Sequence, residues 1–170
     1  GPQNNLTYGQ HAPQMIERGL NGAGNILVFD NGSGTGYPLR KRAPGFSSVM
    51  EIEPLSQSVV WNYNASAPAQ FQALFQSDIV SNAQRLPNGN TLICVGNSGL
   101  FFELAPDTHV VWKYVNPVTD TLPKFQGTTP GSNAVHRSPR YPPDYPGLAG
   151  HDLTPGYPVE RYVTRQTVGL

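Results

Sequence analysis

Apolar residues alternate with polar ones over short stretches of the chain, and Gly, Pro and Asn separate these stretches. This alternation is typical of β-strands that bury one face, and the turn residues between them favour hairpins. No window free of Gly and Pro keeps the i, i+3, i+4, i+7 apolar spacing of a helix. The predicted strands are 12–16, 26–29, 49–52, 59–63, 82–86, 91–95, 100–104 and 110–114. We therefore predict an all-β chain.

The predicted strands fall into two copies of one four-stranded unit. The first copy reads HAPQMI, GNILVFDNG and VMEIEPLSQSVVWNY, and the second reads SNAQRL, GNTLICVGN and LFFELAPDTHVVWKY. Trp61 and Trp112 hold equivalent places about 50 residues apart, a spacing near that of four-stranded propeller blades. We expect both tryptophans to pack within the blades, and we expect Arg85 to point to solvent.

The repeat predicts a single partial β-propeller domain over residues 1–170. Its first blade spans 8–64 and contains an inserted Gly-, Pro- and Arg-containing loop at 33–46, and its second blade spans 75–116. Residues 117–170 form a linker, a partial strand and a Pro- and Gly-rich tail, with a third copy of the repeat starting at 133–141. Because propellers usually close with about four to eight blades, we expect the rest to come from a longer polypeptide or an assembly.

Composition and charge exclude several classes of protein. Eleven Lys and Arg balance eleven Asp and Glu, which argues against a nucleic-acid partner. No apolar run approaches the roughly 20 residues of a membrane span, and no metal-ligand spacing is visible, so neither a metal nor a cofactor is expected. The single Cys94 is expected to be a buried, inert thiol. Sequons at Asn5, Asn31 and Asn64 would permit glycosylation in a secreted protein.

His11 is the candidate for chemistry among the four histidines. The second copy of the repeat carries Ser81 at the corresponding place, so the blade itself does not require a histidine there. A neutral imidazole nitrogen is a good nucleophile near neutral pH, but a histidine at the start of a strand can also bind a backbone carbonyl. The residues alone leave both roles open. The neighbouring Asp30-Asn31-Gly32 stretch predicts a turn with positive φ.

The succession of motifs resembles one known family. GQHAPQMI…GAGNILVFDNG, VMEIEP…VVWNY, FQSDIVSNAQRLPNGNTLICVGNSGLFFEL and HVVWKYVNP are similar to arylsulfotransferases of bacterial type, and NAVHRSPRYPPDYPGLAGHDLTPG resembles their C-terminal end. The resemblance implies a six-bladed propeller that moves a sulfuryl group from a phenolic sulfate ester to another phenol. It implies no use of phosphoadenosine phosphosulfate, a location in the periplasm or outside the cell, and a ping-pong exchange through a sulfated His11.

The resemblance also suggests residues that contact the substrate. Val80 stands where some members carry a pocket threonine, and His136 stands where members carry Tyr or Phe, beside a matched Arg137. We expect Val80, His136, Arg137 and Asn31 to be substrate-binding. Asp78 replaces a proline of the family's pattern. The arginine and further histidines that surround the sulfuryl group in the family come from earlier blades.

Two other functions compete with sulfuryl transfer. The first is a non-catalytic propeller module for binding or for structural or surface assembly, and the departures at Asp78, Val80 and His136 favour it. The second is a quinone-cofactor dehydrogenase propeller, which shares the blade pattern. That enzyme needs a metal and a tryptophan stacked over its cofactor, and the sequence shows neither.

Overall fold

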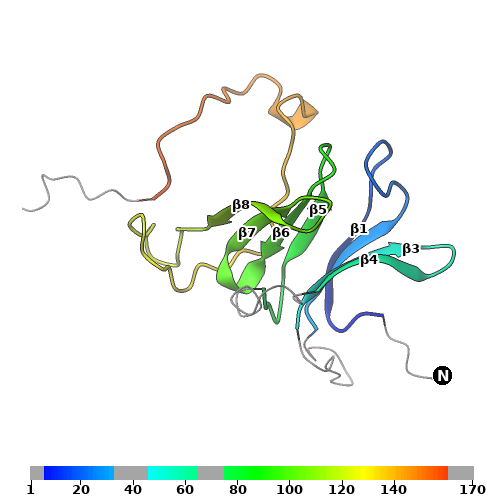
Figure 1. The fold of residues 1–170 in the computed structure, drawn as a ribbon. Helices are drawn as coiled ribbons and strands as arrows, with labels where there is room; N and C mark the ends of the chain where they lie inside the picture. Colours follow the sequence, from blue (N-terminus) through cyan, green and yellow to red (C-terminus); the bar gives the residue numbers. More distant parts are fainter. Residues whose placement is uncertain (1–5, 33–45, 65–74, 161–170) are drawn as a thin grey trace, which may run out of the picture.

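The structure, a computed structural model, describes residues 6–32, 46–64 and 75–160. This part of the chain contains strands and two short 3-10 helices, η1 (Gly96–Ser98) and η2 (Pro146–Leu148) (Figure 1). The strands are β1 (Gln10–Met15), β2 (Ile26–Asp30), β3 (Ser48–Glu53), β4 (Ser58–Asn64), β5 (Asn82–Arg85), β6 (Thr91–Val95), β7 (Leu100–Leu104) and β8 (Val110–Val115). Each predicted strand is therefore present, with ends that differ by at most two residues.

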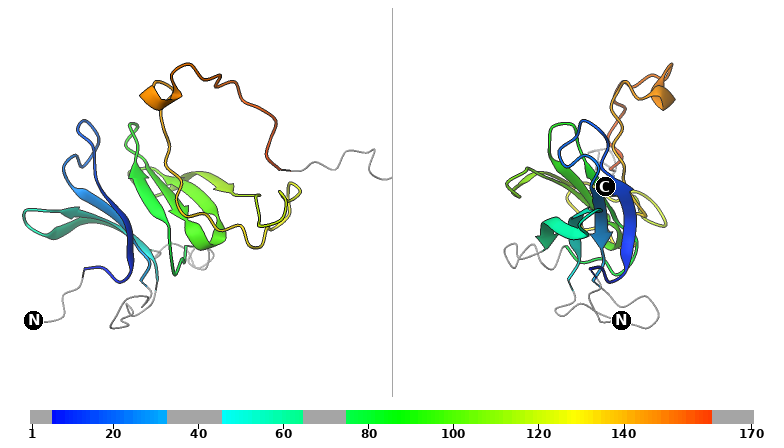
Figure 2. Two further views of the ribbon diagram at one scale, coloured as in Figure 1. Left: turned by 180° about the vertical axis from the view of Figure 1, so that it is seen from behind. Right: turned by 90° about the vertical axis from the view of Figure 1, so that its right-hand side faces the viewer.

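The strands form two antiparallel sheets, each with its four strands in chain order. The sheets have the order β1-β2-β3-β4 and β5-β6-β7-β8, and they stand side by side as successive blades (Figures 1 and 2). This confirms the predicted all-β class and the two four-stranded blades. The closure of a six-bladed ring stays a prediction, and most of the inserted loop lies outside the described residues.

The core lies between the two sheets and is centred on Phe75. This residue precedes β5, and its ring packs edge-on against Phe29 of β2 at 5.8 Å, Tyr63 of β4 at 5.3 Å and Phe102 of β7 at 5.7 Å. Fully buried aliphatic side chains surround these rings: Leu27, Val49, Ile93, Val95 and Leu104. Because residues of both sheets contact one aromatic ring, the two blades share a single core.

Arg85 is buried, contrary to the prediction that it points to solvent. Its Nη2 donates to Oε2 of Glu51 on β3 at 2.6 Å, and its side chain is only 5% exposed. The guanidinium also lies 5.3 Å from the ring centre of Trp61. The sequence of β5 could not reveal this position, because both partners of Arg85 belong to the preceding blade.

Trp61 and Trp112 both take part in packing, but to different extents. Trp61 is partly buried against the core and stacks on Tyr63, with ring centroids 6.4 Å apart. Trp112 stacks on Tyr114 at 6.1 Å and remains 42% exposed. The packing role is confirmed, but neither tryptophan is fully buried.

The C-terminal part follows the second sheet without forming a ladder of its own. Within residues 117–160 the structure has no strand. Residues 136–140 run beside β5, whereas Asn133 and Val135 bind the segment around η1. Beyond Tyr141 the chain leaves the sheets in a wide arc, coloured orange in Figures 1 and 2. Pro142 and Pro143 lack an N–H group, so the chain cannot continue as a paired strand there.

Candidate functional site

His11 lies at the start of β1, next to a bulge in the ladder with β2. The register shifts between His11 and Gln14, where Ala12 has a φ of +48° and Pro13 lacks an N–H group. A bulge redirects the side chains beside it. The imidazole of His11, which is partly buried, faces the segment that leads into β5.

Both ring nitrogens of His11 have partners inside the protein. Nδ1 lies 2.5 Å from Oδ1 of Asn31, and Nε2 lies 3.3 Å from the backbone N–H of Val80. The Asn31 amide nitrogen donates to the carbonyl oxygens of Ser77 at 2.6 Å and Val80 at 3.2 Å, so its oxygen must be the atom that faces His11. Nδ1 of His11 therefore carries the proton, and Nε2 carries the lone pair.

Asn31 is held firmly where it orients His11. The residue is completely buried, and the Ser47 hydroxyl bridges the Asn31 and Ser77 carbonyl oxygens at 3.1 and 3.2 Å. The following Gly32 has a φ of +66°, which confirms the predicted turn. Both amide hydrogens of Asn31 are used within the protein, and its burial leaves no room for a sugar on this sequon in the folded chain. Asn5 lies outside the described residues, as does the side chain of Asn64.

Val80 and Ser81 bring a strained backbone to the site. Their φ angles are +55° and +89°, which is rare for any residue other than glycine and most unusual for a β-branched one. Such strain persists only where the surroundings impose it, and it is common at functional sites. The N–H of Val80 points to His11, while the N–H of Ser81 donates to the carbonyl oxygen of His136 at 3.0 Å. This turn therefore links the first blade to the C-terminal segment.

The predicted site residues are brought together in part. His11, Asn31 and Val80 are in direct contact through hydrogen bonds. His136 is exposed and joins them only through its backbone carbonyl, and Arg137 is also exposed and has no ion-pair partner among the described residues. Contact of any of these residues with a substrate stays a prediction.

Sequence reasoning missed Ser47 and Ser77. These buried serines bind each other, because the Ser47 hydroxyl accepts from the Ser77 N–H at 3.0 Å, and together they position Asn31. A serine beside a strand is common in any turn, so the local sequence carries no signal for this role. Only the pairing of two distant segments reveals it.

Other chemically interesting groups lie away from His11. Burial raises the pKa of the Cys94 thiol to about 12, which confirms the predicted buried and unreactive cysteine. His109 is exposed on a turn beside Asp107. Within the ranges that the structure describes, no group of three or more His, Cys, Asp or Glu is placed to hold a metal ion. The same ranges contain no helix with the length and apolar character of a membrane span.

A groove of about 420 Å³ lies at the other end of β1. Met15, Leu20, Leu86, Tyr141 and Tyr145 contribute to its lining, and His11 does not. The candidate site is therefore distinct from this groove.

Comparison with known protein families finds a match over most of the chain. The family model described as Arylsulfotransferase (ASST) matches residues 2–121, a range that contains His11, Asn31 and Val80 and ends before His136 and Arg137. No curated protein and no solved structure matches the chain.

Proposed function

Because the chain belongs to the arylsulfotransferase family, we propose that it transfers a sulfuryl group from an aryl sulfate to a phenol, with His11 as the nucleophile. The observation that supports this role best is the hydrogen-bonded state of the imidazole. Asn31 Oδ1 holds the proton on Nδ1, so Nε2 carries the lone pair, which accepts the N–H of Val80 at 3.3 Å in the resting protein. An imidazole in this tautomer can attack once that hydrogen bond is released, without first losing a proton.

The proposed reaction proceeds in two balanced steps. In the first, the Nε2 lone pair of His11 attacks the sulfur of the aryl sulfate, the bond between sulfur and the phenolic oxygen breaks, and the phenolate leaves with its electron pair. The ring then carries a positive charge and the attached sulfuryl group a negative one. In the second step, an acceptor phenolate attacks the sulfur, and the electron pair of the S–N bond returns to Nε2.

Two groups beside His11 suit these charge changes. The oxygen of Asn31, 2.5 Å from Nδ1, stabilises the positive ring of the sulfated histidine. The N–H of Val80 binds the Nε2 lone pair at 3.3 Å in the resting protein. Once sulfur occupies that lone pair, this N–H is free to donate to a sulfuryl oxygen, as donors in oxyanion holes do.

Family membership suggests further residues of the proposed site. We propose that His136 and Arg137 contact the substrate from the C-terminal segment, where a guanidinium suits a sulfate ester. Family membership also supports aryl sulfates and phenols as substrates, and a location in the periplasm or outside the cell.

A transfer assay with matched histidine variants tests the proposal. The intact protein is incubated with a chromogenic aryl sulfate and a phenol, and release of the coloured phenol is followed together with sulfation of the acceptor. His11→Ala should abolish transfer, whereas His109→Ala, which alters an exposed histidine, should retain it. Transfer that survives in H11A would exclude His11 as the nucleophile.

A non-catalytic binding or assembly module is the second candidate. It is favoured by the Val80 N–H, which already occupies the His11 nitrogen that would have to react. On this hypothesis His11 and Asn31 only fasten the first blade to the second. Substitution of His11 would then lower stability, and neither the wild-type protein nor the H109A variant would transfer a sulfuryl group.

A further inference from the structure

A buried cluster fastens the second blade to the first. Arg85 of β5 reaches back to Glu51 of β3 at 2.6 Å and covers the ring of Trp61 at 5.3 Å. The same carboxylate accepts a hydrogen bond of 2.6 Å from Asn25, in the turn between β1 and β2. We call this set the first latch.

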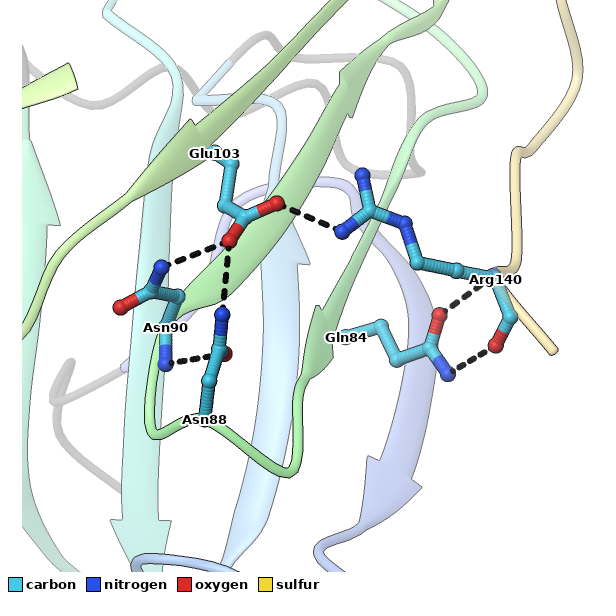
Figure 3. A network of polar contacts seen from close by, with 5 residues as sticks. All are labelled: Gln84, Asn88, Asn90, Glu103 and Arg140. Carbon is cyan, nitrogen blue, oxygen red and sulfur yellow. Dashed lines mark hydrogen bonds and ion pairs between the residues drawn. The ribbon is translucent and has the colours of Figure 1, made fainter. Parts of the chain in front are cut away.

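Arg140 makes an equivalent second latch to the second blade. Its Nη1 lies 2.6 Å from Oε2 of Glu103 on β7, and its guanidinium lies 5.5 Å from the ring centre of Trp112. Glu103 in turn accepts from Asn90 at 2.6 Å and Asn88 at 3.1 Å, in the turn between β5 and β6 (Figure 3). A glutamate, a tryptophan and a turn asparagine thus recur at matching places of both blades. Arg140 makes the same contacts with the second blade that Arg85 makes with the first.

This equivalence places residues 137–141 where a third blade would have its first, inner strand, the counterpart of β1 and β5. Two side chains of β5 bind one edge of the segment. Asn82 Oδ1 accepts from the N–H of Ser138 at 2.8 Å, and the Gln84 amide both accepts from the N–H of Arg140 at 2.7 Å and donates to its carbonyl at 2.9 Å (Figure 3 shows the Gln84 pair). In the same way, the Gln14 amide of β1 donates to the carbonyl of Ala83 in β5.

The opposite edge of the segment is open. In β5 this edge pairs with β6, and the N–H of Leu86 donates to the carbonyl of Asn90 at 2.9 Å. Hydrogen-bonded pairs alternate along an antiparallel ladder, so Gln84 and Asn82 also use this edge. Their equivalents in the segment, counted from Arg140, are Tyr141, Pro139 and Arg137. Within the part of the chain that the structure describes, the backbone groups of these three residues have no hydrogen-bond partner.

We propose that residues 137–141 are the inner strand of a third blade, and that their open edge binds an antiparallel β-strand belonging to the rest of that blade. The occupant is inferred from the two blades present, in which β2 covers the corresponding edge of β1 and β6 that of β5. The occupant therefore has the nearly continuous apolar sequence of β2 and β6, which are buried on both faces. Residues 142–160 do not supply it, because they contain no strand and lead away from the sheets.

Pro139 gives this edge a limited hydrogen-bonding capacity. Arg137 and Tyr141 each offer one N–H and one carbonyl, whereas Pro139 offers only a carbonyl. A proline on an open edge is tolerated and discourages pairing with unrelated strands. The second latch and the Gln84 bonds hold the segment extended without a ladder partner, so the edge is ready for a strand of the right register.

Amide hydrogen exchange tests the open edge with a peptide probe. The probe is a synthetic peptide with the sequence of residues 89–97, GNTLICVGN, which contains β6. In the free protein the amides of Ser138 and Arg140 should be protected and those of Arg137 and Tyr141 should exchange rapidly. Saturating peptide should slow exchange at Arg137 and Tyr141 by about tenfold or more, as expected for newly bonded amides.

Two results would overturn the proposal. One is exchange at Arg137 and Tyr141 that stays unchanged when the peptide is in excess. The other is protection of both amides in the free protein that rises with protein concentration, because a second copy of the chain would then cover the edge. The amide of the exposed Asp120 serves as the internal reference.

Disulfide formation with the same peptide tests the register. Because Asn82 lies opposite Cys94 in the ladder of β5 and β6, the equivalence places Arg137 opposite the cysteine of the bound peptide. With dissolved oxygen as the oxidant, Arg137→Cys should form a mixed disulfide with the peptide about tenfold faster than the control Ser138→Cys, whose side chain points to the other face. The protein's own Cys94 is buried and does not compete. Equal rates for the two variants would contradict the assigned register.

Discussion

Arg85 and Glu51 form a buried ion pair across the interface of the two blades, with a nitrogen–oxygen distance of 2.6 Å and side-chain exposures of 5% and 9%. The pair is not isolated, since Glu51 also binds Asn25 and Arg85 lies over Trp61. A charge of this kind tolerates burial only while its partner is present. The position of the first blade relative to the second therefore depends on this contact.

Removal of one member of the pair should destabilise the protein strongly. Arg85→Met leaves the Glu51 carboxylate buried without its cation, and we expect the free energy of unfolding to fall by about 3–5 kcal/mol. The matched control is Arg140→Met, which breaks the second latch, where the arginine side chain is 42% exposed. Urea denaturation of both variants measures the difference. An equal loss in the two variants would show that burial does not set the strength of the first latch.

The orientation of His11 by Asn31 makes a kinetic prediction that rests on the proposed function. Asn31→Ala removes the acceptor that keeps the proton on Nδ1, so a smaller fraction of His11 presents a lone pair at Nε2. We expect kcat to fall by at least about tenfold while KM changes little, because Asn31 does not need to touch the substrate. The control is Asn97→Ala, at an exposed position in η1. A rise in KM at unchanged kcat would instead indicate that Asn31 binds the substrate.

Gly96 tests the contact between the candidate site and the C-terminal segment. A Cβ at this position would lie 2.3 Å from Cγ2 of Val80 and 2.7 Å from the carbonyl oxygen of Val135. Gly96→Ala should therefore lower the free energy of unfolding by about 1–3 kcal/mol through overpacking. Gly131→Ala is the matched control, because among the described residues no atom beyond its chain neighbours lies within 4 Å of the added methyl group. Thermal unfolding of both variants checks this, and an unaffected G96A variant would contradict the described packing.

The ionisation of Glu103 should make the stability of the folded protein depend on pH. Burial by itself raises the pKa of this carboxyl, but hydrogen bonds from Asn90, Arg140 and Asn88 outweigh it and hold the pKa below its ordinary value of 4.5. A carboxyl with a lowered pKa stabilises the folded state above the pKa of the unfolded chain, and the stabilisation is lost as the pH falls through the folded-state pKa. We expect the melting temperature to decline as the pH falls below about 4.5, and Glu103→Gln to reduce that decline. Identical pH profiles for the two proteins would argue against the Glu103 network.

The sequence predicted the strands well, because their short apolar stretches and the turn residues between them are visible locally. Cys94 and the positive φ of Gly32 were predictable for the same local reason. The burial of Arg85 and the roles of Ser47 and Ser77 were not, since their partners lie in distant segments. The prolines of the C-terminal segment likewise argue against a paired strand in the sequence. Only its hydrogen bonds to side chains of β5 show that the segment lies beside that strand.

Trapping the sulfated intermediate tests the central role of His11 most directly. The intact protein is mixed with an aryl sulfate in the absence of any acceptor, quenched at alkaline pH and digested with trypsin. The peptide that ends at Arg18 contains a single histidine, His11. We expect this peptide to gain the mass of one SO3 group, to lose it when a phenol is added, and to gain nothing in the H11A variant. An unmodified peptide in a protein that transfers the sulfuryl group, or the same gain in H11A, would contradict His11 as the nucleophile.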